Sequence, residues 1–250
     1  MVTRKILLVL GLALTPFAAW SEEEKKSGEL TDPVEILKKV DEATKAVKAV
    51  QYDVEFEGTG AAAARAAKGE GTYLFTGVVG TRPQKYRADI KIKRPDSEEV
   101  QHLTGGSDGD VYFLIDHANK KAYEDIDPAV IGTIGRPLQA GLMVEFVHET
   151  PFTDEINATK HELRGSKTIG GEDCYEIHVG YANQAQEATW YFSKKDFLPR
   201  GRIDFFRVPN QPEGGQQKFL KNLKVDPPID ADAFKLKLPE GYTKTDDFAP

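Results

Sequence analysis

Residues 51–57 read QYDVEFE, and in this stretch aromatic or aliphatic residues alternate strictly with polar and charged ones. The same period of two returns in residues 85–92, which read KYRADIKI. A strand of this kind turns one face to a core and the other to water, which is typical of antiparallel sheets. The sequence therefore predicts a mainly β protein.

Further strand candidates follow along the chain and are separated by clusters of turn-forming residues such as Gly170-Gly171. They are 71–76, 98–104, 110–116, 120–124, 161–169, 173–181, 186–192, 201–207 and 217–225. About eleven short strands at regular spacing predict one antiparallel sheet or barrel rather than two domains. The low-complexity segment 61–68 is expected to be a mobile connection between two of them.

Two segments break this rhythm. In the first, Asp32 can cap a helix, Pro33 suits its first position and Glu35 completes a capping box, so we expect an amphipathic helix over 33–50. The second, residues 128–147, has apolar residues at helical spacing from Leu138 to Val147. It is expected to be a helical insertion that lies across the sheet as a lid; ordinary core cover is the alternative.

Composition excludes several classes of protein. The 250 residues carry 29% charged residues and a net charge of −7, which excludes a polytopic membrane protein and argues against a nucleic-acid partner. The one cysteine, Cys174, rules out an internal disulfide framework and a cysteine-rich zinc site.

The N-terminus is typical of an exported protein. Arg4 and Lys5 precede an apolar run from residue 6 to 19, and Ala19-Trp20-Ser21 fits a small-x-small cleavage site. We expect a signal peptide over 1–21 that is cleaved near Ser21, a flexible tether over 22–30, and one domain over 31–250. A membrane anchor is the alternative for the apolar run.

No catalytic, metal-binding or cofactor-binding motif is recognisable. The five histidines are scattered, and neither His148 nor His161 is followed by the second histidine of a helical zinc site. Cys174, Glu176 and His178 share one strand face, but alternate polar residues on a strand usually mark a solvated face. The sequence predicts neither an enzyme nor a metal or cofactor protein.

Aromatic residues are frequent in the predicted strands. A curved sheet covered by one or two helices is not always filled by its own side chains, and the unfilled volume becomes an apolar pocket. Such a pocket suits an alkyl chain, whose burial contributes about 0.8 kcal/mol per methylene. The periodicity of the strands agrees equally well with the alternative, a fully packed core without a cavity.

Short motifs in a fixed order make the chain resemble a known superfamily. After the opening helix come YDVEF at 52–56, RPQKYR at 82–87 and SDG at 107–109, then WYF at 190–192, FLP at 197–199 and LPEGY at 238–242. The chain resembles the periplasmic outer-membrane lipoprotein carriers, which comprise the LolA and LolB localisation factors, the RseB sensor domain and related exported proteins. The resemblance runs from Asp32 to about Tyr242.

The resemblance implies a fold and a function. The fold is α+β and mainly β, an unclosed antiparallel half-barrel whose concave face is covered by helices. The function is to hold the acyl chains of a lipid or lipoprotein, for periplasmic carriage or sensing, as a monomer that meets a membrane-anchored donor or acceptor. A regulatory protein-interaction module without lipid cargo is the alternative, as in the sensor relatives.

The resemblance also directs attention to particular residues. Arg82 matches the arginine before a proline that holds the helices of the carriers closed. The expected lid consists of Arg82, Leu138, Leu142, Met143 and Phe146. The expected cavity lining consists of Phe56, Phe75, Tyr86, Ile90, Phe113, Tyr175, Ile177, Trp190, Phe192 and Phe205.

Overall fold

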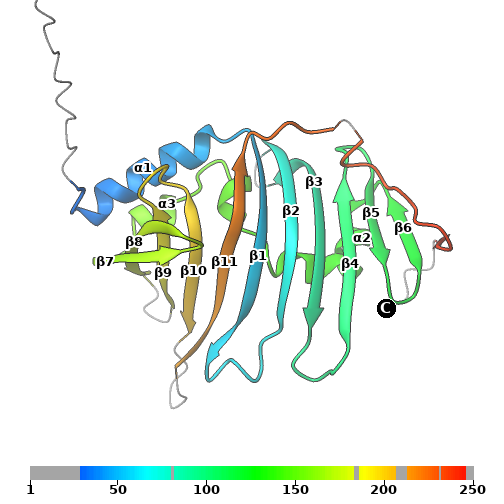
Figure 1. Cartoon of the computed structure of the whole chain (residues 1–250), viewed down its shortest axis with the longest axis horizontal. Helices are drawn as coiled ribbons and strands as arrows, with labels where there is room; N and C mark the ends of the chain where they lie inside the picture. The colour runs from blue at the N-terminus through cyan, green and yellow to red at the C-terminus, as the bar shows by residue number, and fades with distance from the viewer. Residues whose placement is uncertain (1–28, 80–81, 183–185, 207–212, 231, 246–250) are drawn as a thin grey trace, which may run out of the picture.

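The computed structural model describes residues 29–245, except 80–81, 183–185, 207–212 and 231 (Figure 1). The proposed signal peptide and residues 22–28 of the expected tether lie outside the described residues. The end of that tether is docked on the domain, since Glu29 forms an ion pair with Lys194 and Leu30 packs against the core.

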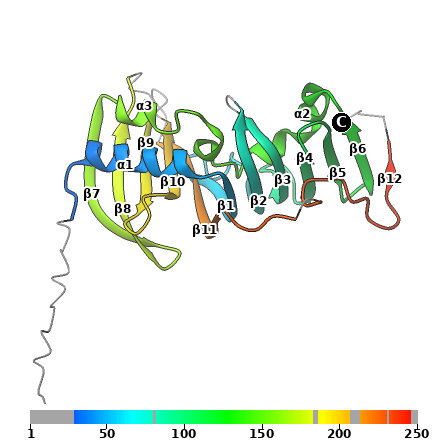
Figure 2. The same ribbon diagram turned by 90° about the horizontal axis from the view of Figure 1, so that it is seen from above.

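The described chain forms a single sheet of twelve strands, in the order β12-β6-β5-β4-β3-β2-β1-β11-β10-β9-β8-β7. The strands are β1 (Ala49–Gly60), β2 (Lys68–Val79), β3 (Arg82–Lys93), β4 (Val100–Ser107), β5 (Tyr112–Asp116), β6 (Lys121–Asp125), β7 (Lys160–Ile169), β8 (Glu172–Gly180), β9 (Gln186–Ser193), β10 (Pro199–Phe206), β11 (Gly214–Val225) and β12 (Thr243–Lys244). The two edge strands do not pair with each other, so the sheet is an open half-barrel (Figure 2). This confirms the expected fold class.

The period of two positions the core. Along β1, Val50, Tyr52, Val54 and Phe56 are buried, while the charged residues between them are more exposed. The eleven predicted strands are all present, and they pair antiparallel with their neighbours. The twelfth, β12, pairs parallel with β6 and was not predicted.

The opening helix α1 (Pro33–Ala46) begins where its cap predicts. The Asp32 carboxylate accepts hydrogen bonds from the backbone N–H groups of Val34, at 2.8 Å, and Glu35, at 3.4 Å. The helix ends at Ala46 instead of residue 50, because Val50 already belongs to the buried face of β1. α1 contacts β7 and α3 (Thr153–Ile156) and covers the β7–β10 end of the sheet (Figure 1).

The insertion at 128–147 differs from the prediction. It consists of helix α2 (Pro128–Gly135) and two short 3-10 helices, η1 (Arg136–Gln139) and η2 (Val144–Val147), instead of one helix through Leu138–Val147. It crosses the same face of the sheet as α1: α2 contacts β5 and β6, η1 contacts β3 and β4, and η2 contacts β2. We call this the inner face and the opposite one the outer face.

The C-terminal segment covers part of the outer face. Leu236 and Tyr242 pack on a small cluster formed by Phe113, Ile115 and Ala122. The segment 61–67 between β1 and β2 forms a turn in which the Ala61 N–H donates to the Glu213 carbonyl.

Candidate functional site

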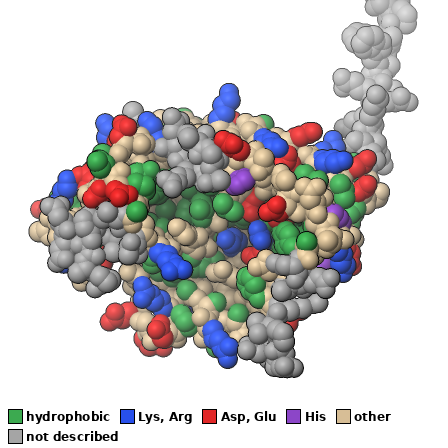
Figure 3. Space-filling view, turned by 180° about the vertical axis from the view of Figure 1, so that it is seen from behind, with side chains coloured by type: hydrophobic (Ala, Val, Ile, Leu, Met, Phe, Trp, Pro, Cys, Tyr) green, Lys and Arg blue, Asp and Glu red, His purple; other side chains and the backbone are tan. Residues whose placement is uncertain are grey.

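An apolar pocket of about 320 Å³ lies between the inner face of the sheet and the insertion. Its walls come from β2, β3 and β5 on one side and from α2, η1 and η2 with their connection on the other. The lining residues are Tyr73, Phe75, Tyr86, Ala88, Tyr112, Pro128, Ile131, Gly132, Gly135, Leu138, Gln139, Leu142, Val144 and Val147. From this side, hydrophobic side chains gather in a hollow with charged side chains around it (Figure 3).

Two tyrosine hydroxyls hold the insertion on the sheet. The Tyr73 hydroxyl donates to the Leu138 carbonyl at 2.7 Å and accepts from the Gly141 N–H at 3.1 Å. The Tyr52 hydroxyl accepts from the Met143 N–H at 2.9 Å and lies 3.4 Å from the Gly141 carbonyl, to which it donates. The two rings are stacked with their centroids 5.3 Å apart. We refer to these contacts as the tyrosine latch.

Close approach at two glycines allows this contact. A Cβ at Gly141 would lie 2.6 Å from a methyl group of Val54 and 2.8 Å from the Tyr73 ring. A Cβ at Gly105 would lie 2.2 Å from a methyl group of Leu138. Only a residue without a side chain therefore lets the insertion backbone lie against the tyrosines and Leu138 lie against β4.

Buried charges form a second link between sheet and insertion. The Lys218 ammonium donates to the Leu142 carbonyl at 3.0 Å, and the Arg202 guanidinium donates to Glu145 at 3.1 Å and to Asp204 at 2.5 Å. The guanidinium also lies over the ring of Trp190, 4.5 Å from its centroid.

Burial shifts the protonation equilibria of these groups. It raises the pKa of the Glu145 carboxyl despite the nearby Arg202, and it lowers the pKa of the Lys218 ammonium. Burial also raises the pKa of the Tyr86 hydroxyl at the pocket wall to about 12. The insertion is thus held by groups whose charged forms lose hydration in the closed arrangement.

The structure brings only some of the predicted site residues to the pocket. Phe75 and Tyr86 line it from the sheet, and Leu138 and Leu142 line it from the insertion. Met143 and Phe146 also belong to the insertion, but their side chains are buried in the main core and do not line the pocket. Arg82 begins β3, and its side chain lies outside the described part of the chain.

The remaining predicted cavity residues do not line this pocket. Those buried in the main core of the inner face are Phe56, Ile90, Tyr175, Ile177, Trp190 and Phe192. Trp190 is enclosed by Phe152 and Phe192, with ring centroids 5.2 and 5.6 Å away, so this half of the inner face is filled by its own side chains. Phe113 was wrongly assigned, because it packs under the C-terminal segment on the outer face. Phe205 is likewise on the outer face, 6.3 Å from the His178 ring.

Sequence reasoning missed the tyrosine latch and most of the pocket wall contributed by the insertion. Tyr52 stands in the stretch that decides the fold, and its alternation with Asp53 places it on the inner face. That pattern could have shown that its hydroxyl is buried, and a buried hydroxyl requires a hydrogen-bond partner. It could not have shown that the partner comes from residue 143.

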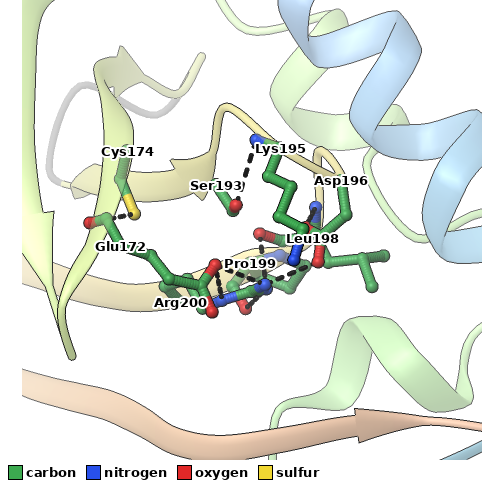
Figure 4. Close-up of polar contacts among 8 residues, drawn as sticks. All are labelled: Glu172, Cys174, Ser193, Lys195, Asp196, Leu198, Pro199 and Arg200. Carbon is green, nitrogen blue, oxygen red and sulfur yellow. Dashed lines mark hydrogen bonds and ion pairs between the residues drawn. The ribbon is translucent and has the colours of Figure 1, made fainter.

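A buried arginine, Arg200, links strands at the β7–β10 end of the sheet and does not line the pocket. Arg200 is 5% exposed, and its guanidinium donates to Glu172 at 2.8 and 3.0 Å and to Asp196 at 2.6 Å (Figure 4). It also donates to the carbonyls of Leu198 and Pro199. The polar groups of this cluster satisfy one another, so we assign it a structural role.

Among the described residues, no helix combines the length and the hydropathy needed to cross a bilayer.

No family model and no curated protein matches the sequence. Solved structures with a similar fold include MucB of Pseudomonas aeruginosa in complex with MucA, with 11% identity and a TM-score of 0.46 over 83% of this chain and 62% of that one. The lipoprotein LppX of Mycobacterium tuberculosis is 12% identical, with a TM-score of 0.46 over 81% of this chain and 100% of that one. A LolA superfamily protein of Nitrosomonas europaea is 12% identical, with a TM-score of 0.35 over 83% and 99%.

The structural neighbours thus include the group that the sequence motifs resemble. The chain spans about three fifths of the length of the MucB chain.

Proposed function

We propose that the protein is an exported, periplasmic binding protein that holds one acyl chain of a lipid or lipoprotein in the pocket below the insertion. The proposed signal peptide over residues 1–21 would direct the protein to that compartment. We propose that it acts there as a monomer. A membrane-anchored donor or acceptor would supply or remove the chain. The role is binding and carriage, without catalysis.

The observation that carries this proposal is the apolar pocket itself. Its volume of about 320 Å³ lies at the lower end of the range for ligand sites, and Gln139 is the one lining residue with a side-chain amide or charge. A methylene occupies nearly the volume of a water molecule, ~30 Å³, so the closed pocket accepts about ten of them. Their transfer from water contributes about 8 kcal/mol before the cost of ordering the chain.

The insertion is the element that has to move. It covers the pocket and contacts β2 to β6, and the tyrosine latch, Lys218 and Arg202 hold it there. We propose that it is the lid, and that opening it exposes the apolar wall to an incoming chain. The latch would hold this lid closed, and the expected part of Arg82 in doing so remains a proposal.

A matched pair of variants at Gly132 tests the site. This glycine lies in α2, lines the pocket, and has no atom within 4 Å of the position of a Cβ. Gly132→Ala adds helix propensity without filling the pocket, whereas Gly132→Phe adds a ring at the pocket wall. Both variants are expected to fold, so a difference between them reports on the pocket.

The protein would be purified under native conditions and extracted with organic solvent for lipid mass spectrometry, and displacement of a fluorescent fatty acid would be measured. We expect co-purifying acyl lipid and saturable displacement with the wild type and with Gly132→Ala, and at least tenfold weaker binding with Gly132→Phe. Absence of both bound lipid and probe binding would overturn the proposal and favour the protein-interaction module.

A further inference from the structure

Three potential metal ligands meet on the outer face of the sheet, away from the apolar pocket. Asp89 lies on β3, His102 on β4 and His117 in the turn between β5 and β6. Each offers one ligand atom, and these three atoms lie within 4.8 Å of one another. The His102 Nε2 is 3.0 Å from the Asp89 Oδ1, and the two imidazole rings are stacked with centroids 3.9 Å apart.

Outer hydrogen bonds hold these side chains in place. The Thr104 hydroxyl, on a residue that is 1% exposed, donates to the Asp89 Oδ2 at 2.5 Å and lies 2.8 Å from the His117 Nε2. On its other side, the His117 Nδ1 lies 2.9 Å from the Tyr242 hydroxyl. Because the Thr104 hydroxyl gives its one hydrogen to Asp89, its oxygen accepts from His117 Nε2–H in this arrangement. A metal ion at Nε2 would replace this hydrogen bond, and the ring would then carry its proton on Nδ1, from which the Tyr242 hydroxyl can accept. Such outer partners are typical of histidines that bind metals.

The protonation states suit a ligand set. Partial burial alone would raise the pKa of Asp89, but the hydrogen bonds from Thr104 and His102 hold it below its usual value. Burial and the neighbouring His102 lower the pKa of His117. Both directions are compatible with metal ligands, and the proposal itself rests on the geometry of the three side chains.

We propose that Asp89, His102 and His117 form a binding site for one divalent transition-metal ion, with Zn²⁺ as the expected occupant. Two imidazoles and one carboxylate are ligands that Zn²⁺ accepts, and three protein ligands leave at least one coordination position open. The His102 and Asp89 side chains are 34% and 47% exposed, so this position is accessible from solvent. Asp89 also borders a polar depression of about 410 Å³ on the outer face.

A bound ion would add a link between strands that are otherwise connected mainly by the hydrogen bonds of the sheet. A bound ion ties β3 to β4 and to the β5–β6 turn, and Tyr242 extends this link to the C-terminal segment that pairs with β6 through β12. Arg87 precedes Asp89 on the same face, and its guanidinium is directed to the Phe113 ring and the Lys235 carbonyl. The carboxylate of Asp116 lies near His117 and offsets that positive charge.

The test uses the full mature chain without an affinity tag, stripped of metal by dialysis against a chelator. Titration with Zn²⁺ in a calorimeter is expected to show one equivalent bound, and Zn²⁺ is expected to raise the melting temperature. His102→Asn and His117→Asn should each weaken binding at least tenfold, and Tyr242→Phe should weaken it about tenfold through the lost outer partner. His148→Asn, at a histidine on the other side of the sheet, is the matched control and should bind as the wild type.

Cobalt provides a second measurement that does not depend on stability. Co²⁺ added to the stripped protein should give visible ligand-field absorption, which should be lost in His117→Asn and retained in His148→Asn. Circular dichroism of each variant shows whether it is folded. Failure of the wild type to bind Zn²⁺ in a saturable way would overturn the site, and so would equal binding by the wild type, His102→Asn and His117→Asn.

Discussion

Removal of one hydroxyl should release the lid. In Tyr73→Phe the ring and its stacking on Tyr52 remain, but the closed lid loses two hydrogen bonds, from the Tyr73 hydroxyl to the Leu138 carbonyl and from the Gly141 N–H to that hydroxyl. Both backbone groups are left without these partners in a buried site. When the lid is open, water can satisfy them.

The magnitude follows from this difference between closed and open lid. An unsatisfied buried donor or acceptor costs about 1–3 kcal/mol, so two of them destabilise the closed arrangement by about 2–6 kcal/mol. Since about 1.4 kcal/mol corresponds to a factor of ten, the equilibrium constant for opening should rise roughly 30- to 20,000-fold. The sheet below retains its own core, so the unfolding midpoint should fall much less than this factor implies.

Amide hydrogen exchange measures lid opening directly. Peptides that cover residues 136–147 should exchange faster in Tyr73→Phe by the stated factor, while peptides from β8 and β9 should keep their wild-type rates. Tyr112→Phe is the matched control: it removes a hydroxyl at the same pocket that makes no hydrogen bond to the described residues. Equal exchange over 136–147 in Tyr73→Phe, Tyr112→Phe and the wild type would refute the latch.

Three further predictions test charge and packing. Glu145→Gln removes a carboxyl whose pKa is raised by burial, so the folded protein binds that proton more tightly than the unfolded chain does. The wild type therefore loses stability as the pH rises above about 4.5. In urea unfolding, the free energy of unfolding of the variant relative to that of the wild type should increase from pH 4 to pH 7. Arg200→Met removes the guanidinium from two carboxylates whose side chains are 42% and 36% exposed, so water can solvate them, and urea unfolding should show a loss of about 1–3 kcal/mol without a change in probe binding. Gly105→Val places methyl groups against Leu138 and should cost about 1–3 kcal/mol and speed exchange of the lid.

The sheet was predictable because its strands bury one face. In residues 51–57 and 85–92 the alternation predicts a strand and predicts that its apolar residues face the core. The structure has a strand at each of these places, with the apolar residues on the core side. β12 has two residues, Thr243 and Lys244, and no alternation can be recognised over that length.

The prediction of the cavity lining was wrong for a strand that is buried on both faces, where alternation gives no information. Residues 112–115 form an apolar run that is covered on both faces, by the insertion inside and by the C-terminal segment outside. A strand buried on both sides has no polar face to fix its orientation, and this is why Phe113 was placed on the wrong side.

The conformation of the insertion and the proposed metal ligands could not be read from local patterns either. The spacing of Leu138, Leu142 and Phe146 fits a helix, yet Pro137 and Gly141 interrupt it, and the tyrosine hydroxyls take backbone groups that a helix would use. Asp89 and His117 are distant in sequence and meet only through the pairing of β3 with β4 and β4 with β5. The register between neighbouring strands determines that Asp89 and His117 lie close together, and this register cannot be derived from a single sequence.

Pocket volume and latch strength together predict how affinity depends on chain length. The closed pocket accepts about ten methylenes, so affinity for saturated fatty acids should rise by about 0.8 kcal/mol per carbon up to that length. Beyond it, further methylenes are buried only if the lid opens, which costs the four latch hydrogen bonds, about 0.5–1.5 kcal/mol net for each and about 2–6 kcal/mol together. Six further methylenes contribute about 5 kcal/mol, which offsets this cost over most of that range.

The affinity curve should therefore flatten just above ten carbons and rise again toward sixteen. In Tyr73→Phe the latch is weakened, so the plateau should shrink or disappear while the initial slope stays the same. Displacement of a fluorescent fatty acid by a series from eight to sixteen carbons measures both curves. A wild-type affinity that rises at one constant slope through the whole series would show that the lid does not limit the pocket. A plateau of the same length in both proteins would show that something other than the Tyr73 hydroxyl holds the lid closed.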